Sequence, residues 1–257
     1  MRALITNDDG IGSAGIHVLA TAAVEAGLDV TVAAPSWDSS GASASLTSVE
    51  TDGRLLVEER RLEGLDDVRA FAVEAAPAYI VRAAITGAFG PPPDLVLSGV
   101  NHGRNTGFAV LHSGTVGAAL TAMTHERRAM AVSIDSATPT HWDTAAKVAS
   151  VALRWLIDVE SPIVLNVNVP DVAGDQLGGF RRAHLAKFGA VQTMLTETGS
   201  GYVKFEYRDV DAEYEEGTDA ALLAAGIASF TPLQPVCEAS SVDTTALEDL
   251  REAGAQR

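Results

Sequence analysis

Short hydrophobic runs alternate with longer segments of helical spacing along the first two thirds of the chain. Strands are predicted at 3–6, 28–34, 95–97, 129–134 and 163–169, and helices at 15–26, 77–88, 114–123 and 144–156. This β-α-β-α order is typical of an α/β fold, with a Rossmann-like, mostly parallel sheet and helices on both faces. Sheets of this kind bind ligands beyond the carboxyl ends of their strands.

Two segments break the alternation. Residues 45–70 are charged and partly extended, which predicts a hairpin at the margin of the sheet. Residues 171–207 lack helical periodicity, and 203–207 alternate as a strand does, so this stretch is either an arm that reaches a partner subunit or a locally packed hairpin. Residues 238–257 are polar and are expected to form a surface helix. We treat 1–257 as a single domain, with a core at 1–170 and a C-terminal arm with closing elements at 171–257.

Composition narrows the class of protein. The 257 residues include 34 acidic and 18 basic side chains, a net charge of −16, which disfavours a nucleic-acid polymer or an anionic membrane as a partner. Small anionic substrates stay open, because a metal ion can reverse the local field. Cys237 is the only cysteine, and neither a signal peptide nor a membrane span is recognisable. We therefore expect a soluble, cytoplasmic protein without an internal disulfide.

Asp8 and Asp9 follow the first predicted strand directly. Two adjacent carboxylates at the end of a buried strand repel each other, and their pKa values rise unless a cation neutralises them. Hard divalent ions such as Mg²⁺ and Mn²⁺ prefer oxygen ligands of this kind. The alternative is a solvated turn that caps the following helix.

A second motif overlaps these residues. Gly10, Gly12 and Gly15 fit G-x-G-x-x-G between a strand and a helix, the fingerprint of dinucleotide-binding oxidoreductases. Two adjacent carboxylates beside a pyrophosphate count against that interpretation. The second strand also ends at Pro35 without the acidic residue that would hold a ribose.

Two later loops offer complementary chemistry. Residues 36–43 contain hydroxyls and a glycine, and residues 98–107 contain three glycines and two asparagines. The small residues from Ser113 onward open a helix, whose free N–H groups can receive phosphate oxygens. Carboxylates, hydroxyls, an amide and an anion-binding helix start together favour metal-assisted phosphoryl transfer to water.

At these loops the sequence resembles the SurE family, the stationary-phase survival proteins that act as 5′/3′-nucleotidases. The matching blocks are 7–10, 40–43, 98–101, 113–119, 165–170, and 217–219 with 229–233. The resemblance implies a Rossmann-like fold with a C-terminal arm exchanged in homodimers or homotetramers. It also implies a phosphoric monoester hydrolase that uses one divalent metal ion, Mg²⁺ or Mn²⁺, on nucleoside 5′- or 3′-monophosphates and in some members on short polyphosphate.

Site residues follow from the same resemblance. It implies a metal held by Asp8, Asp9, Ser40 and Asn101, with Asp8, Asp9 and Asn101 catalytic. It implies phosphate contacts from Asn105, Ser113, Gly114 and Thr115. Asp9 is the more suitable of the two aspartates to orient or deprotonate the attacking water.

The chain also departs from the family pattern. Phe108 and Ala109 stand where aspartates are usual, and His112 replaces a common tyrosine. These changes leave the implied metal ligands intact and affect the leaving-group pocket and subunit contacts. A further family block is reduced to Ala75–Tyr79, and the departures around Phe108 and Tyr79 motivate an alternative, a catalytically impaired nucleotide-binding sensor. His102 and His112 are either general acids for the leaving group or ordinary surface residues.

Overall fold

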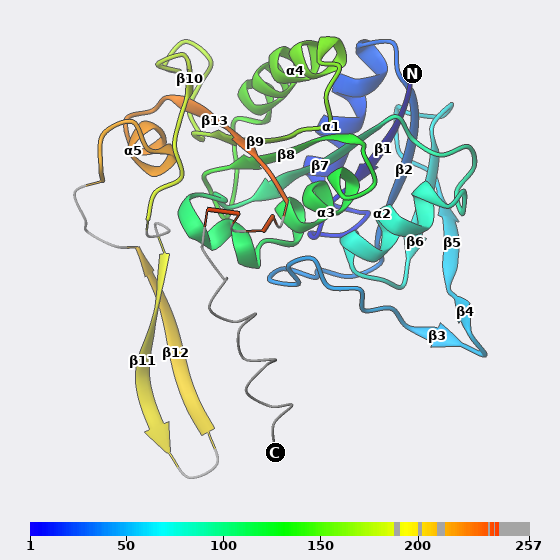
Figure 1. The fold of residues 1–257 in the computed structure, drawn as a ribbon, viewed down its shortest axis with the longest axis horizontal. Helices are drawn as coiled ribbons and strands as arrows, with labels where there is room; N and C mark the ends of the chain where they lie inside the picture. Colours follow the sequence, from blue (N-terminus) through cyan, green and yellow to red (C-terminus); the bar gives the residue numbers. More distant parts are fainter. Residues whose placement is uncertain (188–190, 200–201, 210–213, 236, 239, 242–257) are drawn as a thin grey trace, which may run out of the picture.

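The fold is built around one nine-stranded sheet (Figure 1). The computed structural model describes residues 1–187, 191–199, 202–209, 214–235, 237–238 and 240–241. Its strands, in chain order, are β1 (Arg2–Thr6), β2 (Asp29–Pro35), β5 (Val57–Arg60), β6 (Arg69–Val73), β7 (Leu95–His102), β8 (Arg128–Ile134), β9 (Val164–Val169), β10 (Phe180–Arg182) and β13 (Ala228–Leu233). The spatial order is β10-β13-β9-β8-β7-β1-β2-β6-β5. The six strands from β9 to β6 are parallel, which confirms the predicted fold class.

The helices divide between the two faces of this sheet. They are α1 (Ala14–Glu25), α2 (Pro77–Ile85), α3 (Gly114–Met123), α4 (Trp142–Asp158) and the short α5 (Asp219–Ala224), with a 3₁₀ helix η1 at Gly107–His112. Alternate residues of β1 point to opposite faces, as in any strand. Ile5 packs with α1 and α4, whereas Leu4 packs with α2 and α3. The sheet is therefore covered on both sides, as its nearly continuous apolar strands require.

Several boundaries differ from the sequence-based predictions. The segment 45–70, predicted as a hairpin at the margin of the sheet, contains the small hairpin of β3 (Glu50–Thr51) and β4 (Arg54–Leu55). It also leads into β6, which pairs with β2 in the main sheet. β6 was missed because its buried residues are mostly alanines, a weak strand signal. The exposed, charged strand β5 then pairs antiparallel with β6 and closes the edge.

The later part of the chain forms two structures. β13 pairs antiparallel with β9 and parallel with β10, so it extends the sheet beyond the predicted core. β11 (Val191–Gly199) and β12 (Tyr202–Asp209) form a separate antiparallel ribbon that projects from the body (Figure 1). The helix predicted at 238–257 lies almost entirely outside the described residues. Within the described part of the chain, no helix has the length and hydrophobicity needed to span a bilayer.

Candidate active site

The order in which strands are added to the sheet reverses between β1 and β7. From β1 the chain proceeds outward to β2 and β6, and it then returns to β7 and proceeds the other way to β8 and β9. Such a switch point leaves a crevice at the carboxyl ends of the two central strands, where doubly wound proteins bind ligands. Asp8 and Asp9 follow β1, and Asn101 lies near the end of β7. The topology therefore places the predicted site at the crevice.

Asp8 is almost completely buried beneath the first turn of α3. The hydroxyl of Thr115 donates to Asp8 Oδ1 over 2.5 Å. A Cβ at Gly114 would lie 2.7 Å from Asp8 Oδ2, so only glycine lets the carboxylate approach the helix this closely. Burial raises the pKa of Asp8, and the Thr115 hydroxyl opposes that effect. The Thr115 side chain predicted to contact phosphate is thus bound to a carboxylate here.

Asp9 is less buried than Asp8. Burial, followed by the charge of Asp8, raises the pKa of Asp9 from 3.8 to about 7. The main-chain N–H of His102 donates to Asp9 Oδ2 over 3.3 Å, which ties the end of β1 to the end of β7. The Oδ1 oxygen is not engaged by that contact. Two adjacent aspartates whose pKa values are both raised mark this strand end as a candidate functional site.

The loop after β2 is fixed to the same point. Ser39 donates to the carbonyl oxygen of Asp8 from its main-chain nitrogen over 2.7 Å and from its hydroxyl over 3.2 Å. Ser40 donates from both its N–H and its hydroxyl to Asp38 Oδ1, at 2.9 and 2.6 Å. These two bonds lower the pKa of Asp38. The negative charge of Asp38 in turn raises the pKa values of Asp8 and Asp9, a contribution that the sequence analysis missed.

Asn101 is positioned by an irregularity in β7. The predicted loop at 98–107 begins later than expected, because β7 continues to His102 with a register shift against β8 between Ser98 and Asn101. The Asn101 amide nitrogen donates to the carbonyl oxygens of residues 102 and 103, at 3.1 and 2.6 Å. With both amide hydrogens directed to carbonyls, the side-chain oxygen is the atom that Asn101 can offer to a cation.

Asn105 is held on all sides by the neighbouring strands. Its N–H donates to Asn168 Oδ1 over 2.8 Å, and its carbonyl oxygen accepts from the side chains of Asn166 and Asn168 at 2.9 and 3.0 Å. Its own amide nitrogen donates to Ser133 Oγ over 2.8 Å. Asn166 and Asn168 were not predicted as site residues, although asparagines at two alternate positions of a buried strand need polar partners and so indicate such contacts.

The start of α3 is a capped helix end beside these loops. Ser113 Oγ accepts the N–H of Val116 over 3.1 Å, and the N–H groups of Gly114 and Thr115 have no acceptor within the helix. The loop after β2 packs on this helix, since a Cβ at Gly117 would lie 2.4 Å from the carbonyl oxygen of Ser43. The Ser113–Thr115 turn therefore presents N–H donors next to the aspartates, as an anion site requires.

The donor set suits a hard cation. Asp8 and Asp9 offer carboxylate oxygens, Ser40 a hydroxyl oxygen and Asn101 an amide oxygen, the ligand types of Mg²⁺ and Mn²⁺. Across the described ranges, no group of three or more His, Cys, Asp or Glu side chains is arranged to hold a metal. A zinc-type cluster is thus missing from that part of the chain, and a cation at the crevice depends on the serine and the asparagine as well.

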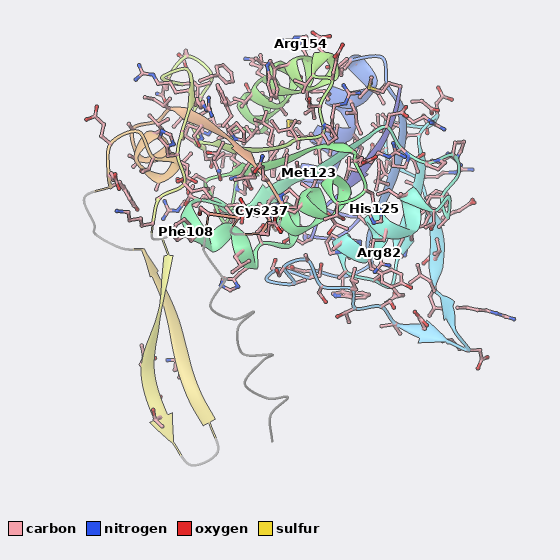
Figure 2. All side chains as sticks on the ribbon, in the orientation of Figure 1. Arg82, Phe108, Met123, His125, Arg154 and Cys237 are labelled. Carbon is pink, nitrogen blue, oxygen red and sulfur yellow. The ribbon has the colours of Figure 1, made fainter. Side chains whose placement is uncertain are left out.

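The outer rim of the crevice carries the aromatic and charged residues. The ring of His102 lies 5.4 Å from that of Trp142, between centroids, and Arg104 forms an ion pair with Asp135 at 3.4 Å. His112 and Phe108 are exposed on η1, where Figure 2 labels the phenylalanine.

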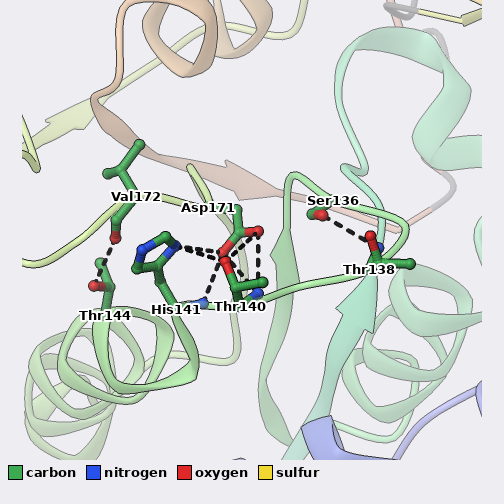
Figure 3. A network of polar contacts seen from close by, with 7 residues as sticks. All are labelled: Ser136, Thr138, Thr140, His141, Thr144, Asp171 and Val172. Atoms are coloured by element: carbon green, nitrogen blue, oxygen red, sulfur yellow. Dashed lines mark hydrogen bonds and ion pairs between the residues drawn. The ribbon is translucent and has the colours of Figure 1, made fainter.

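The start of α4 is fixed by a polar network near the same edge. Asp171 accepts the N–H groups of Thr140 and His141 at 2.8–3.1 Å, and His141 Nδ1 also lies 3.0 Å from it (Figure 3). The network ties the residues that precede α4 to the loop after β9, which is a structural role.

The glycine fingerprint has a packing explanation. A Cβ at Gly15 would lie 1.8 Å from the carbonyl oxygen of Val100, so this glycine lets α1 lie against β7. Gly10 has a φ of +94°, which a turn directly after β1 requires. The motif therefore needs no dinucleotide to account for it.

Comparison with known proteins supports one family. The family described as "Survival protein SurE" matches residues 3–191. The 5′-nucleotidase SurE of Methylococcus capsulatus is 36% identical, covering 99% of this chain and 97% of the relative, and that of Aeromonas hydrophila is 34% identical, covering 99% and 98%. The crystal structure of the SurE protein from Aquifex aeolicus superposes with a TM-score of 0.77 at 28% identity, covering 98% of this chain and all of that one.

Proposed function

The chain belongs to the SurE family, and from this premise we propose that it is a divalent-metal-dependent phosphoric monoester hydrolase that converts nucleoside 5′-monophosphates into nucleoside and phosphate. The observation that carries the proposal is the convergence of three strand-end loops on Asp8 and Asp9. Main-chain and side-chain hydrogen bonds tie Ser39 to Asp8 and His102 to Asp9, and Ser40 and Asn101 are the chain neighbours of Ser39 and His102. The relatives named above are 5′-nucleotidases, which favours the 5′-ester over the 3′-ester as substrate.

The metal is held, in this proposal, by Asp8, Asp9, Ser40 and Asn101. A bound Mg²⁺ or Mn²⁺ supplies Lewis-acid chemistry, since it neutralises phosphoryl oxygens and lowers the pKa of water. The hydroxyl hydrogen of Ser40 is directed to Asp38, so the lone pairs of that oxygen are free for a cation. Asp38 thereby orients Ser40 as a ligand.

The remaining protein groups bind the phosphate and orient the attacking water. Asn105, Ser113 and the N–H group of Gly114 bind the phosphate oxygens at the start of α3, whereas Thr115 holds the Asp8 carboxylate. Asp9 orients the attacking water and accepts its proton on Oδ1, the oxygen that His102 does not bind. The new P–O bond forms as the bond to the nucleoside oxygen breaks, and that oxygen leaves with a proton from solvent or a rim side chain.

Assembly and location extend the proposal. We expect a homodimer or homotetramer, because the β11–β12 ribbon projects from the body and an apolar groove of about 610 Å³ lies over β9 and β13. The groove is lined by exposed Trp155 and Phe180 among others. A cytoplasmic location accords with a chain that has one cysteine, which is unpaired.

The test is phosphate release from a panel of nucleoside 5′- and 3′-monophosphates with Mg²⁺, Mn²⁺ or EDTA. We expect turnover that EDTA abolishes and that Asp8→Asn and Asp9→Asn lower by at least about 10³-fold, as loss of a metal ligand does. Asp143→Asn, which changes an exposed carboxylate on α4, serves as the control. Binding of nucleotide without turnover in any metal would refute the enzyme and favour the sensor alternative.

A further inference from the structure

Asn105 forms four hydrogen bonds with side chains of β8 and β9. Asn166 and Asn168 are 0% and 1% exposed, in a strand where every other described side chain is apolar. Burying an amide in such a place is unfavourable unless its polar atoms find partners. Both asparagines direct their Nδ2 groups at one atom, the carbonyl oxygen of Asn105. Their Nδ2 groups are therefore satisfied by a residue 61 and 63 positions earlier in the chain, whereas Asn166 Oδ1 is buried without a hydrogen-bond partner among the described residues.

The period of a strand explains why both asparagines reach the same loop. Leu165, Val167 and Val169 pack in the core beneath α1 and α4. Residues 166 and 168 must point to the opposite face, toward α3 and η1. The loop that follows β7 crosses this face, so both amides meet its main chain.

Asn168 binds Asn105 from two directions at once. Its Oδ1 accepts the N–H of Asn105 over 2.8 Å while its Nδ2 donates to the carbonyl oxygen of the same residue over 3.0 Å. A bidentate contact of this kind fixes both peptide planes that flank the Asn105 Cα. Ser133 then fixes the side chain, because its hydroxyl accepts from Asn105 Nδ2 over 2.8 Å. The Asn105 Oδ1 oxygen and the remaining amide hydrogen are thus held in set directions.

We infer that Asn168, with Asn166 and Ser133, is a positioning residue that holds the Asn105 side chain ready for an anionic phosphoryl group at the crevice. The inference rests on the proposed function, in which Asn105 contacts the phosphate. None of the three residues touches substrate in this role; they act through Asn105. Displacing a binding group by about 1 Å costs on the order of 10²-fold in rate, so loss of this support is measurable.

The experiment uses Asn168→Leu and Ser133→Ala in the full-length protein. Asn168→Leu keeps the branching at Cγ and the number of side-chain heavy atoms, removes both hydrogen bonds and adds no charge near the phosphate. Ser133→Ala removes a single oxygen and folds even where the first variant does not. We expect kcat/KM to fall about 10- to 100-fold for Asn168→Leu and about 3- to 10-fold for Ser133→Ala. Ser229→Ala is the matched control, since Ser229 pairs with Asn168 across β9 and β13, is equally buried and has no hydrogen-bond partner among the described residues.

A double-mutant cycle with Asn105→Ala separates positioning from stability. Asn105→Ala keeps the main-chain N–H and C=O that Asn168 binds but removes the side chain being positioned. We therefore expect Asn168→Leu to cost less than about twofold in kcat/KM in that background, whereas its effect on melting temperature is the same in both. Equal fold-losses of kcat/KM in both backgrounds would overturn the inference, as would unchanged kinetics in both Asn168→Leu and Ser133→Ala.

Inorganic phosphate provides a readout independent of turnover. Its dissociation constant, measured by calorimetry, should rise in Asn168→Leu and be unaffected by the same change in the Asn105→Ala background. If the parent protein hydrolyses no nucleotide but shows this coupling, the proposed function fails and the positioning role stands. If it hydrolyses nucleotides without the coupling, the positioning role fails alone. A parent that neither hydrolyses nucleotide nor binds phosphate overturns both.

Discussion

Replacing Asp9 by asparagine should stabilise the metal-free protein while it abolishes activity. Asp9 lies beside Asp8 and near Asp38, without an ion pair to a basic side chain in the described residues. Its carboxylate must therefore ionise against burial and two like charges. Asn has the same shape and no charge, so Asp9→Asn removes that cost but also removes a metal ligand.

The size of the effect follows from the pKa of Asp9, which rises from 3.8 to about 7. At about 1.4 kcal/mol for each tenfold change in the ionisation equilibrium, full ionisation costs about 4 kcal/mol. Because the side chain is only partly buried, solvent screening reduces this to about 2 kcal/mol. The folded-state pKa lies above the unfolded one, so stability is fully present below about pH 4 and is lost as the pH rises to about 7.

The assay is urea unfolding of parent and Asp9→Asn in EDTA at pH 4, 6 and 8. We expect the free energies of unfolding to be similar at pH 4 and the variant to exceed the parent by about 2 kcal/mol at pH 8. Excess Mg²⁺ should stabilise the parent and leave the variant unchanged. A gain that is equal at all three pH values, or a loss at pH 8, would refute the electrostatic reasoning.

Three further predictions follow from close contacts. Gly114→Ala places a methyl group against the Asp8 carboxylate and should lower activity by about 10²-fold in initial-rate assays. Its control is Gly12→Ala, whose methyl group meets open space and should leave activity within about twofold. Asp219→Asn sets an amide against one of the three N–H groups that the carboxylate accepts and should lower the free energy of unfolding by about 1–3 kcal/mol in urea titrations. Gly15→Ala should reduce the melting temperature by more than about 5 °C, because its Cβ overlaps a main-chain oxygen of β7.

The central sheet and the location of the crevice could be predicted because they depend on local patterns. Hydrophobic periodicity predicted β1, β2, β8 and β9 to within about two residues, and the order of elements predicted a mostly parallel sheet. Asp8 and Asp9 stood out because adjacent carboxylates directly after a buried strand are uncommon and chemically costly.

The hydrogen-bond partners of the predicted residues could not be predicted from local patterns, because they lie far away in the sequence. Thr115 meets Asp8 across 107 positions, and Asp219 meets the N–H of Gly107 across 112. Neither pair shares a local pattern, and only the folded sheet brings the two members of each pair together. The role of Asp38 was missed for a related reason, since its bond to Ser40 is local but its effect on Asp8 depends on how the loop folds back.

The bonds of Asp219 have a consequence for any attempt to shorten this protein. All the proposed ligands precede residue 191, where the family match ends, so a truncation there removes none of them. Yet the Asp219 carboxylate reaches back to the N–H groups of Gly107 and Ala186, and β13 covers the outer edge of β9. During synthesis, the crevice therefore cannot reach its final form until the ribosome has released the chain well beyond residue 219.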